Sequence, residues 1–195
     1  MGRNQVMDGP ATTSCKTGSI ITFGEIMLRL SKHCGQRLFT GYAFDAAYGG
    51  SEANVAISLA QLGDDVEYVT RVPNNPIGRA ALMRLRELGL NVSHVVVGGK
   101  RLGTYYFEPS AGMRSSQVVY DRDDSSFNTL EHGDIDWQTI FQNVSLFHCS
   151  GITCATTQDA LDTTMDAVRT AFDSGIELTC DINYRASLWK YPGAN

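Results

Sequence analysis

The sequence predicts an α/β fold in which a parallel sheet is covered by helices and a smaller antiparallel piece projects from it. Short apolar runs alternate with helix-length segments at both ends of the chain. Between these ends stand three strand-like runs that are separated by turn-rich segments. Alternating strands and helices are typical of parallel sheets, whereas consecutive short strands indicate antiparallel pairing.

The N-terminal third opens the alternating pattern. Residues 19–23 form an apolar run that predicts a buried strand ending at the next glycine. Residues 30–48 are polar and aromatic, and within them we expect a short exposed strand over 37–44. Residues 51–62 are apolar nearly all round, so we expect a helix that is buried on most faces.

The pattern then repeats before the strand-rich middle. Residues 65–71 alternate like a strand. A second helix should begin after Asn75, which suits the N-cap, with Pro76 in the first position, and should end at Gly89. Three further strands are expected, over residues 92–97, 104–108 and 117–120.

The C-terminal third returns to alternation. A helix should carry Trp137, and a buried strand over 146–150 should close at Gly151. A helix over 157–174 follows, and the last strand covers 176–183. Helical spacing predicts that one face of the long helix is buried through Leu161, Met165, Val168 and Phe172.

Composition excludes several classes of protein. The chain has 195 residues with 43% hydrophobic residues, a net charge of −5 and a pI near 5.3. This balance fits a globular protein and disfavours a nucleic-acid surface, which needs a basic patch. No apolar run approaches the length of a membrane span. Residues 1–18 are polar and lack an apolar segment typical of secretion signals, so we expect a disordered tail.

Cysteines and histidines give no metal or disulfide pattern. The five cysteines include no CxxC pair, and this usage indicates a reducing cytoplasm. Cys149 and Cys180 stand in apolar runs and should be buried. His148 also stands in an apolar run, where a hydrogen-bonded core histidine is expected.

Candidate binding residues gather where predicted strands end. A glycine pair, Gly49-Gly50, precedes the first helix, and Asn54 lies in the first turn of that helix. Paired glycines let backbone amides approach a ligand, and a helix start offers free N–H groups. Polar clusters at residues 24–25, 150–151 and 181–185 should meet at one edge of the sheet.

Arginines and tyrosines complete this set. A guanidinium group suits a carboxylate or phosphate, and a tyrosine hydroxyl suits sugar oxygens, although each residue alone also fits an ordinary surface or half-buried position. Phosphate-binding GxxxxGK[ST], dinucleotide-binding GxGxxG and nucleophile-elbow GxSxG motifs do not occur. The candidates are Arg29, Tyr105, Tyr120, Arg122, Tyr184 and Arg185.

Residues 20–189 resemble the N-terminal half of the ribokinase-like (PfkB) carbohydrate kinases. The segments that carry the resemblance are 22–31, 48–54 and 75–78. Three others resemble one subgroup, the 2-keto-3-deoxygluconate kinases: residues 101–106, residues 118–122, and residues 180–185 with Leu188-Trp189. The resemblance implies a ribokinase-like three-layer α/β/α sandwich, incomplete at the C-terminus, with a small antiparallel β lid whose strands fall within 34–45 and 92–122.

A charge argument supports the subgroup. Neutral-sugar kinases that this chain resembles place an aspartate five residues after the first glycine, where this sequence has Arg29. A sugar acid carries a carboxylate of its own, so its site needs more cations and fewer acids. Arg29 is therefore a candidate for binding a sugar acid.

The resemblance also implies roles for particular residues. Gly49, Gly50 and Asn54 would bind substrate hydroxyls. The lid strands would line the pocket. Arg185 would reach the substrate carboxylate or the transferred phosphate, and with Asn183 it would contribute to the cofactor side. The pocket-lining residues from the lid would be Tyr105, Tyr120 and Arg122.

In the family that this chain resembles, ATP with Mg²⁺ phosphorylates a sugar hydroxyl, and the catalytic base is an aspartate in a Gly-Ala-Gly-Asp motif. This sequence has no such motif, so we assign no catalytic residue and no metal ligand within the chain. We expect a sugar-binding fragment of a kinase. Other interpretations remain open: a fructokinase-type or ribokinase-type enzyme, or a non-catalytic module for sugar-acid binding or dimerisation.

The aromatic lid further predicts a homodimer, since lids of such kinases commonly pair between subunits. The residues that would form this interface are Phe39, Tyr42, Phe44, Tyr105, Tyr106 and Phe107.

Overall fold

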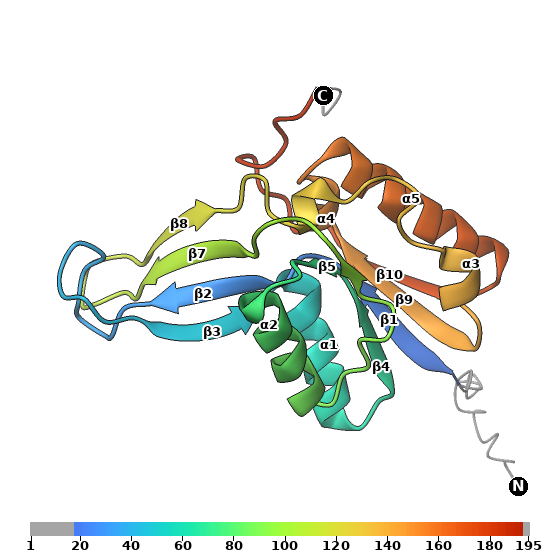
Figure 1. The fold of residues 1–195 in the computed structure, drawn as a ribbon, viewed down its shortest axis with the longest axis horizontal. Helices are drawn as coiled ribbons and strands as arrows, with labels where there is room; N and C mark the ends of the chain where they lie inside the picture. The colour runs from blue at the N-terminus through green and yellow to red at the C-terminus, as the bar shows by residue number, and fades with distance from the viewer. Residues whose placement is uncertain (1–17, 193–195) are drawn as a thin grey trace, which may run out of the picture.

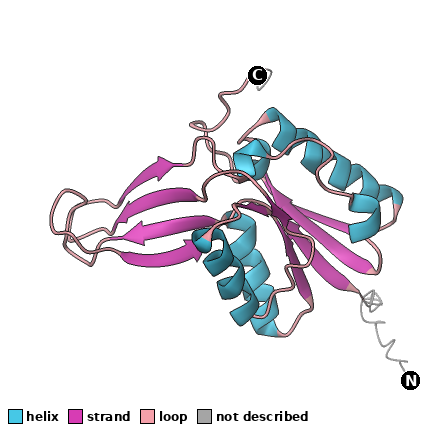
Figure 2. Ribbon diagram, viewed as in Figure 1, coloured by secondary structure: helices cyan, strands magenta, loops and turns pink. Residues whose placement is uncertain are grey.

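A four-stranded parallel sheet forms the body of the protein in the computed structural model, which describes residues 18–192 (Figures 1 and 2). Strand β1 lies inside the sheet because its apolar residues are buried on both faces. The order across the sheet is β10 (Glu177–Asp181), β9 (Val144–Ser150), β1 (Ser19–Phe23) and β4 (Val66–Val69).

Helices cover both faces of this sheet, as the α/β prediction requires (Figure 1). One core joins Ile21 and Phe23 to the aromatic residues of α3 (Trp137–Ile140) and to α5 (Gln158–Asp173). A second core on the opposite face joins Tyr68 to the residues of α1 (Ser51–Leu62) and α2 (Pro76–Glu87). These two cores make the three layers of an α/β/α sandwich.

A second sheet projects from the body as a lid (Figure 2). Its order is β3 (Asp45–Gly49), β2 (Met27–Ser31), β7 (Gly103–Glu108) and β8 (Gln117–Asp121). The expectation of an antiparallel lid is only partly right, because the central pair β2 and β7 is parallel. Both strands begin where the chain leaves the body, whereas β3 and β8 pair antiparallel with them and return toward it.

Short elements complete the architecture. The pair β5 (Arg71–Val72) and β6 (Val96–Val97) is parallel. Helix α4 (Gly151–Cys154) begins where β9 ends, and the 3₁₀ turn η1 is Phe127–Thr129. Gly151 therefore starts a helix rather than only closing a strand, and a Cβ there would lie 2.2 Å from the carbonyl oxygen of Ile182.

Several predicted elements are confirmed with their capping residues. Strand β1 and helix α1 have the expected bounds. The Asn75 side chain accepts a hydrogen bond from the Gly78 N–H at 2.9 Å, so it caps α2. Thr157 caps α5 in the same way by accepting from Ala160 N–H. The strand expected over 92–97 shrinks to its last two residues.

The exposed strand predicted over 37–44 is wrong. That segment forms turns and irregular loop structure, and the strand begins only at Asp45. A buried lysine organises the loop: Lys32 Nζ donates to the carbonyls of Gly41 (3.2 Å) and Ala43 (2.9 Å) and lies 3.9 Å from the centre of the Phe44 ring. Two carbonyls of this segment are thus satisfied by one lysine side chain, and the Leu38 N–H by the Glu108 carboxylate, instead of by a strand ladder.

The buried faces of two helices also differ from prediction. On α5 the apolar residues Met165 and Phe172 are 38% and 74% exposed. Small residues contact the sheet instead, because they allow a close approach: Ala160, Thr163, Thr164, Ala167 and Ala171 are buried. Helix α1 is buried only along Glu52, Ala53 and Ala56, and not on most faces.

The predicted environments of the cysteines and of His148 were partly right. Cys149 is buried, and burial raises the pKa of its thiol, but Cys180 is exposed because it lies on the edge strand β10. His148 is a core histidine whose Nδ1 lies 2.9 Å from Thr179 Oγ1.

The tail expected over 1–18 lies outside the described residues, apart from Gly18. Within residues 18–192, no helix has both the length and the apolar character needed to cross a membrane.

Candidate functional site

A cavity of about 420 Å³ lies between the lid and the carboxyl ends of β1, β9 and β10. This is the edge at which ligands bind in parallel α/β sheets. Its polar lining comes from segments far apart in sequence: Glu25, Gly49, Gly50, Ser51, Glu52, Asn54, Tyr105, Tyr120, Arg122, Asp181, Asn183, Arg185 and Ser187.

The glycine pair has two different tasks in the wall of this cavity. A Cβ at Gly50 would lie 2.1 Å from the carbonyl oxygen of Glu25, so only glycine fits where the two turns cross. At Gly49 a Cβ position would stand 3.6 Å from Asn54 Oδ1 and 3.7 Å from the Tyr105 hydroxyl. Gly49 therefore leaves a polar hollow in which an amide and a phenol face the same space.

A row of residues on neighbouring lid strands faces the cavity side. Strand register pairs Arg29 with Tyr105, and Tyr105 with Tyr120, whose rings are 5.7 Å apart. Burial raises the pKa of the Tyr105 hydroxyl, and the nearby Arg29 guanidinium opposes this rise. Tyr105 thus remains a neutral hydrogen-bond donor at neutral pH.

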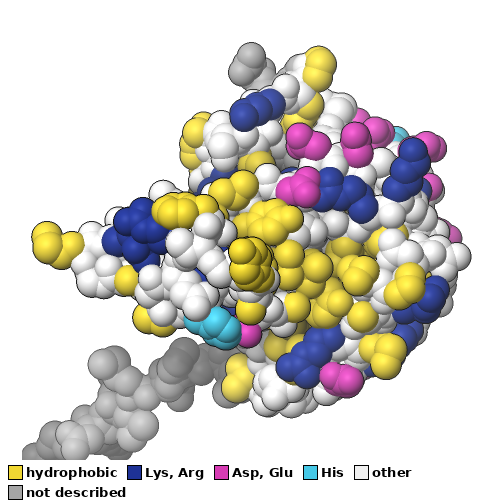
Figure 3. All heavy atoms as spheres, turned by 60° about the vertical axis from the view of Figure 1, so that its left-hand side comes forward, with side chains coloured by type: hydrophobic (Ala, Val, Ile, Leu, Met, Phe, Trp, Pro, Cys, Tyr) yellow, Lys and Arg dark blue, Asp and Glu magenta, His cyan; other side chains and the backbone are white. Residues whose placement is uncertain are grey.

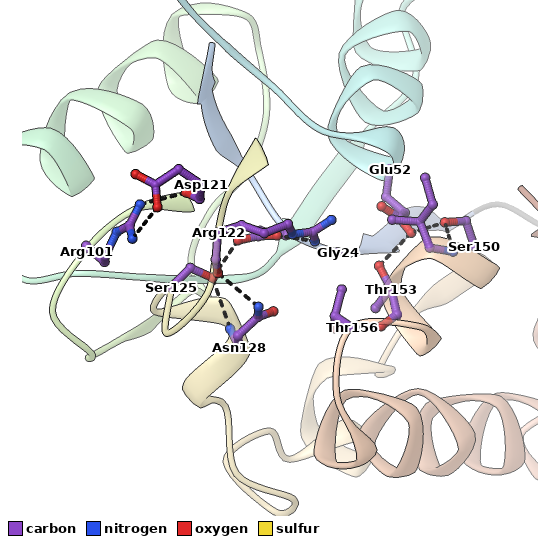
Figure 4. A network of polar contacts seen from close by, with 12 residues as sticks. Gly24, Glu52, Arg101, Asp121, Arg122, Ser125, Asn128, Ser150, Thr153 and Thr156 are labelled. Carbon is purple, nitrogen blue, oxygen red and sulfur yellow. Dashed lines mark hydrogen bonds and ion pairs between the residues drawn. The ribbon is translucent and has the colours of Figure 1, made fainter. Parts of the chain in front are cut away.

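Arg122 is the buried cation of the cavity. Its side chain follows β8 and forms an ion pair with Glu25, which stands in the turn between β1 and β2. The Ser125 hydroxyl donates to the other Glu25 oxygen at 2.6 Å. Burial raises the pKa of the Glu25 carboxyl, while Arg122 and Ser125 limit the rise. Figure 4 shows Arg122, Ser125 and Asn128 gathered at this point.

A second buried carboxyl group supports the opposite wall. Glu52 in the first turn of α1 accepts hydrogen bonds from the hydroxyls of Ser150 and Thr153 (Figure 4). Burial raises the pKa of Glu52, and these hydroxyls offset part of that rise. A Cβ at Gly24 would lie 2.2 Å from a Glu52 oxygen, so the glycine provides room for the carboxyl group.

The segment after β10 closes the third side. Asp181 accepts from the Asn183 backbone N–H at 3.0 Å, and the Asn183 side chain donates to Ser51 Oγ at 3.0 Å. Arg185 is exposed at the rim, where its guanidinium donates to the Tyr184 carbonyl. The rim therefore offers amide and guanidinium donors to an anion.

The structure brings most of the predicted site residues together. Arg29 is not among the lining residues: it stands two register positions farther along β2 than Met27, which does line the cavity, and its strand partner Tyr105 lines the cavity instead. Tyr184 is also absent from the lining. The predicted residues in the wall are Gly49, Gly50, Asn54, Tyr105, Tyr120, Arg122, Asn183 and Arg185.

Glu25 belongs to a polar cluster that was expected at this edge of the sheet, but neither it nor Glu52 was predicted as a site residue. Glu52 directly follows the glycine pair and helix start, which is a usable signal for a pocket residue. The pairing of Glu25 with Arg122 spans 97 residues, and no local pattern indicates it.

The lining offers a small polar ligand hydrogen-bond donors, acceptors and guanidinium groups. Hydroxyl, amide and guanidinium groups line the cavity together with three carboxyl groups, those of Glu25, Glu52 and Asp181. Among residues 18–192, no group of three or more His, Cys, Asp or Glu side chains could hold a metal ion.

An α/β sandwich with a lid over a polar cavity at its strand ends defines a class of small-molecule-binding proteins. Comparison with known families is more specific: the model of the pfkB family carbohydrate kinases matches residues 17–194. The chain belongs to this family, and its fold is ribokinase-like.

Individual relatives match most of this chain and about half of their own length. A 2-dehydro-3-deoxygalactonokinase of Haloferax volcanii is 32% identical over 173 residues, which cover 89% of this chain and 54% of the relative. The crystal structure of a 2-dehydro-3-deoxygluconokinase from Thermotoga maritima is similar with a TM-score of 0.86 and 44% identity, covering 88% of this chain and 53% of that one.

A more distant structure shares the fold. It is a sugar kinase of Pyrococcus horikoshii in complex with ATP, with a TM-score of 0.77 and 22% identity over 87% of this chain and 55% of that one. This chain therefore spans about half the length of the proteins it matches.

Proposed function

We propose that this chain is the sugar-binding and lid part of an ATP-dependent kinase that phosphorylates 2-keto-3-deoxygluconate or a stereoisomer of it. The observation that carries the proposal is a polar cavity that combines hydroxyl and amide groups with a buried arginine. A sugar acid needs both kinds of partner, because its carboxylate seeks a guanidinium group and its hydroxyls seek neutral donors and acceptors.

In this proposal Gly49, Gly50 and Asn54 contact substrate hydroxyls. Tyr105 and Tyr120 cover the sugar from the lid. The carboxylate is bound by Arg122, with Arg185 at the rim and Arg29 contributing through Tyr105. The names of the relatives from Haloferax volcanii and Thermotoga maritima, both kinases of 2-dehydro-3-deoxy sugar acids, support this substrate class.

ATP fits this chain in part. Asn183 and Arg185 stand on the rim with amide and guanidinium donors, which is the donor set that a phosphoryl group needs. When bound, ATP supplies the phosphoryl group that is transferred. Mg²⁺ finds no fitting cluster among residues 18–192, so we assign no step to it. Residues 1–195 contain no Gly-x-Gly-Asp motif, and the property we propose for this chain by itself is sugar-acid binding.

A homodimer formed through the lid is part of the proposal. Large hydrophobic side chains of the lid are exposed, including Phe39 (78%), Tyr42 (104%) and Val119 (52%). Figure 3, which brings the lid end forward, shows hydrophobic side chains over much of the surface facing the reader. Covering such a surface with a second copy would remove apolar area from water. A monomeric mass in light scattering at micromolar concentration would contradict the dimer.

We also propose the cytoplasm as the compartment. The described cysteines, at positions 34, 149, 154 and 180, are all free thiols. Such usage suits a reducing environment.

Calorimetric titration of the purified chain tests the substrate. We expect saturable binding of 2-keto-3-deoxygluconate or 2-keto-3-deoxygalactonate, and no binding of fructose, in the absence of nucleotide. Preference for fructose would favour a fructokinase-type enzyme instead. A phosphotransfer assay with ATP then separates an enzyme from a non-catalytic sugar-acid-binding module.

A further inference from the structure

Arg122 is held where the chain leaves the lid. Its side chain is 8% exposed, and its Nη2 group pairs with the Glu25 carboxylate, whose side chain is 3% exposed. Its backbone carbonyl accepts a hydrogen bond from Asn128 Nδ2 at 3.0 Å. Backbone and side chain are thus both fixed, and the guanidinium group cannot turn away from the cavity without breaking the ion pair.

The carboxylate that holds Arg122 is itself confined. A Cβ at Gly103 would lie 2.4 Å from one Glu25 oxygen, so the lid strand β7 packs directly on the carboxylate. The carbonyl of Glu25 is packed equally closely by Gly50. Ser125 donates to the same oxygen that Gly103 faces. Glu25 is therefore confined to a single position, and the ion pair fixes the position of the Arg122 guanidinium group.

One donor of the guanidinium group remains unpaired. Arg122 Nε is buried and has no hydrogen-bond partner among residues 18–192, although the side chain lines the cavity. A buried N–H group without an acceptor is unfavourable. Nε itself is closed off from the cavity, so a carboxylate entering the cavity would bind the part of the guanidinium group that lines it, since guanidinium groups offer carboxylates more than one N–H.

We propose that Glu25 is a positioning residue that orients Arg122 so that its guanidinium group recognises the carboxylate of the sugar acid. The inference rests on the proposed function. It assigns binding of the substrate carboxylate to Arg122, and selectivity for acids to Glu25, the ion-pair partner of Arg122. Glu25 acts through Arg122 and needs no contact with the substrate.

The test compares two ligands with the same hydroxyl groups that differ at the acid group: 2-keto-3-deoxygluconate and its uncharged carboxamide. A loss of structure would weaken both, whereas loss of Arg122 orientation would weaken the acid alone. We expect Glu25→Ala and Glu25→Asp to lower acid affinity about tenfold or more, as loss of a hydrogen bond to a charged group does. Glu25→Gln keeps an acceptor oxygen at the same distance and should recover part of this loss.

A matched control lies in strand β4. Glu67 is also buried (7% exposed) and its carboxyl group lies 2.6 Å from His94 Nδ1, but it is not part of the cavity wall. Glu67→Gln should leave the ratio of acid to carboxamide affinity unchanged. An equal loss for both ligands in the Glu25 variants, or an unchanged acid affinity in Glu25→Ala, would overturn the proposal.

A second readout does not depend on the ligand. The Arg122 Nε–H resonance, assigned by its loss in Arg122→Lys, should be resolved in the wild-type chain and should shift or broaden in Glu25→Ala but not in Glu67→Gln. An unchanged resonance in Glu25→Ala would overturn the positioning role even if neither sugar acid bound. Absence of binding by the wild-type chain would instead count against the proposed function.

Discussion

The two walls of the cavity are each supported by a buried glutamate, and the two carboxyl groups are satisfied in different ways. Glu25 pairs with a guanidinium group and ties the turn after β1 to the root of the lid. Glu52 accepts hydrogen bonds from the hydroxyls of Ser150 and Thr153, with backbone groups of Glu52 and Ser150 beside them, and ties the start of α1 to α4. One wall therefore depends on charge, and the other depends on close packing around a carboxyl group that can be neutral.

The difference matters because a buried ion pair and a buried acid respond to substitution in opposite ways. Removing one member of an ion pair leaves the other charge without a partner in a low-dielectric environment. Replacing a buried acid by its amide removes a charge that was already unfavourable. The comparison can be tested by changing each carboxyl group and its neighbours.

Glu25→Ala should have the largest effect. Arg122 remains charged and loses its partner while buried, so the free energy of unfolding should fall by about 3–5 kcal/mol. Denaturant unfolding of the two chains measures the difference. A loss under about 1 kcal/mol would show that water reaches Arg122 and that the pair is not confined as described.

Gly24→Ala should come next. The added Cβ would stand 2.2 Å from Glu52 Oε2 and 2.5 Å from Cδ, so the carboxyl group must shift, which strains the hydrogen bonds that Oε1 accepts from Ser150 and Thr153. We expect a loss of about 1–3 kcal/mol, as in other overpacked sites. The double variant Gly24→Ala/Glu52→Ala should lose less than the sum of the single changes, and strict additivity would contradict the contact.

The pH dependence should separate Glu52 further. Its pKa is raised above the usual value of 4.5 by burial, so the folded chain binds the proton more tightly than the unfolded chain. Stability from this group is therefore complete at low pH and is lost as pH rises from about 4.5 through the folded pKa, with each unit of pKa difference worth about 1.4 kcal/mol.

Glu52→Gln should remove this pH dependence. The free energy of unfolding of the variant, relative to that of the wild type, should therefore increase as pH rises from about 5 to about 8. Glu25, whose pKa burial also raises, keeps its own contribution of the same sign in both chains. Unfolding curves across this range measure the gain. Parallel stability profiles for the two chains would show that the raised pKa of Glu52 has no thermodynamic consequence.

Thr153→Val should have the smallest effect. The substitution keeps the shape of the side chain and removes one hydroxyl, whose bond to Glu52 is 2.7 Å long, so we expect a loss of about 1 kcal/mol. Ser125→Ala removes a hydroxyl that donates to a carboxylate in an ion pair and should cost more. Equal losses of unfolding free energy in Thr153→Val and Ser125→Ala would contradict the distinction between the two walls.

Local sequence patterns predicted the framework of this protein well where neighbouring residues decide the outcome. Asn75-Pro76 specifies the start of α2 because the amide caps the first turn and proline needs no N–H there. The apolar run of β1 could only be an interior strand. Strand-end polar clusters at 24–25 and 181–185 do meet at the cavity, because carboxyl ends of parallel strands share one edge.

Local patterns gave wrong predictions where contacts with residues distant in sequence determine the local structure. Apolar spacing favoured Met165 and Phe172 as the inner face of α5, but the short distance to the sheet selected the alanine and threonine face. The loop over 37–44 has strand-like residues, yet two carbonyl oxygens, those of Gly41 and Ala43, accept hydrogen bonds from the buried Lys32 amine. Tertiary context overrides propensity in both cases.

The sequence by itself determined the alternation of strands and helices, the glycine pair before α1, and the family resemblance that these carry. Those features depend on neighbouring residues, whose spacing is fixed by the covalent chain. Only the tertiary structure decided that Glu25 and Arg122, which are 97 residues apart, form one unit, and that Arg29 lies outside the cavity lining. Pairing across such a separation depends on where the lid returns to the body, and burial makes that placement energetically decisive.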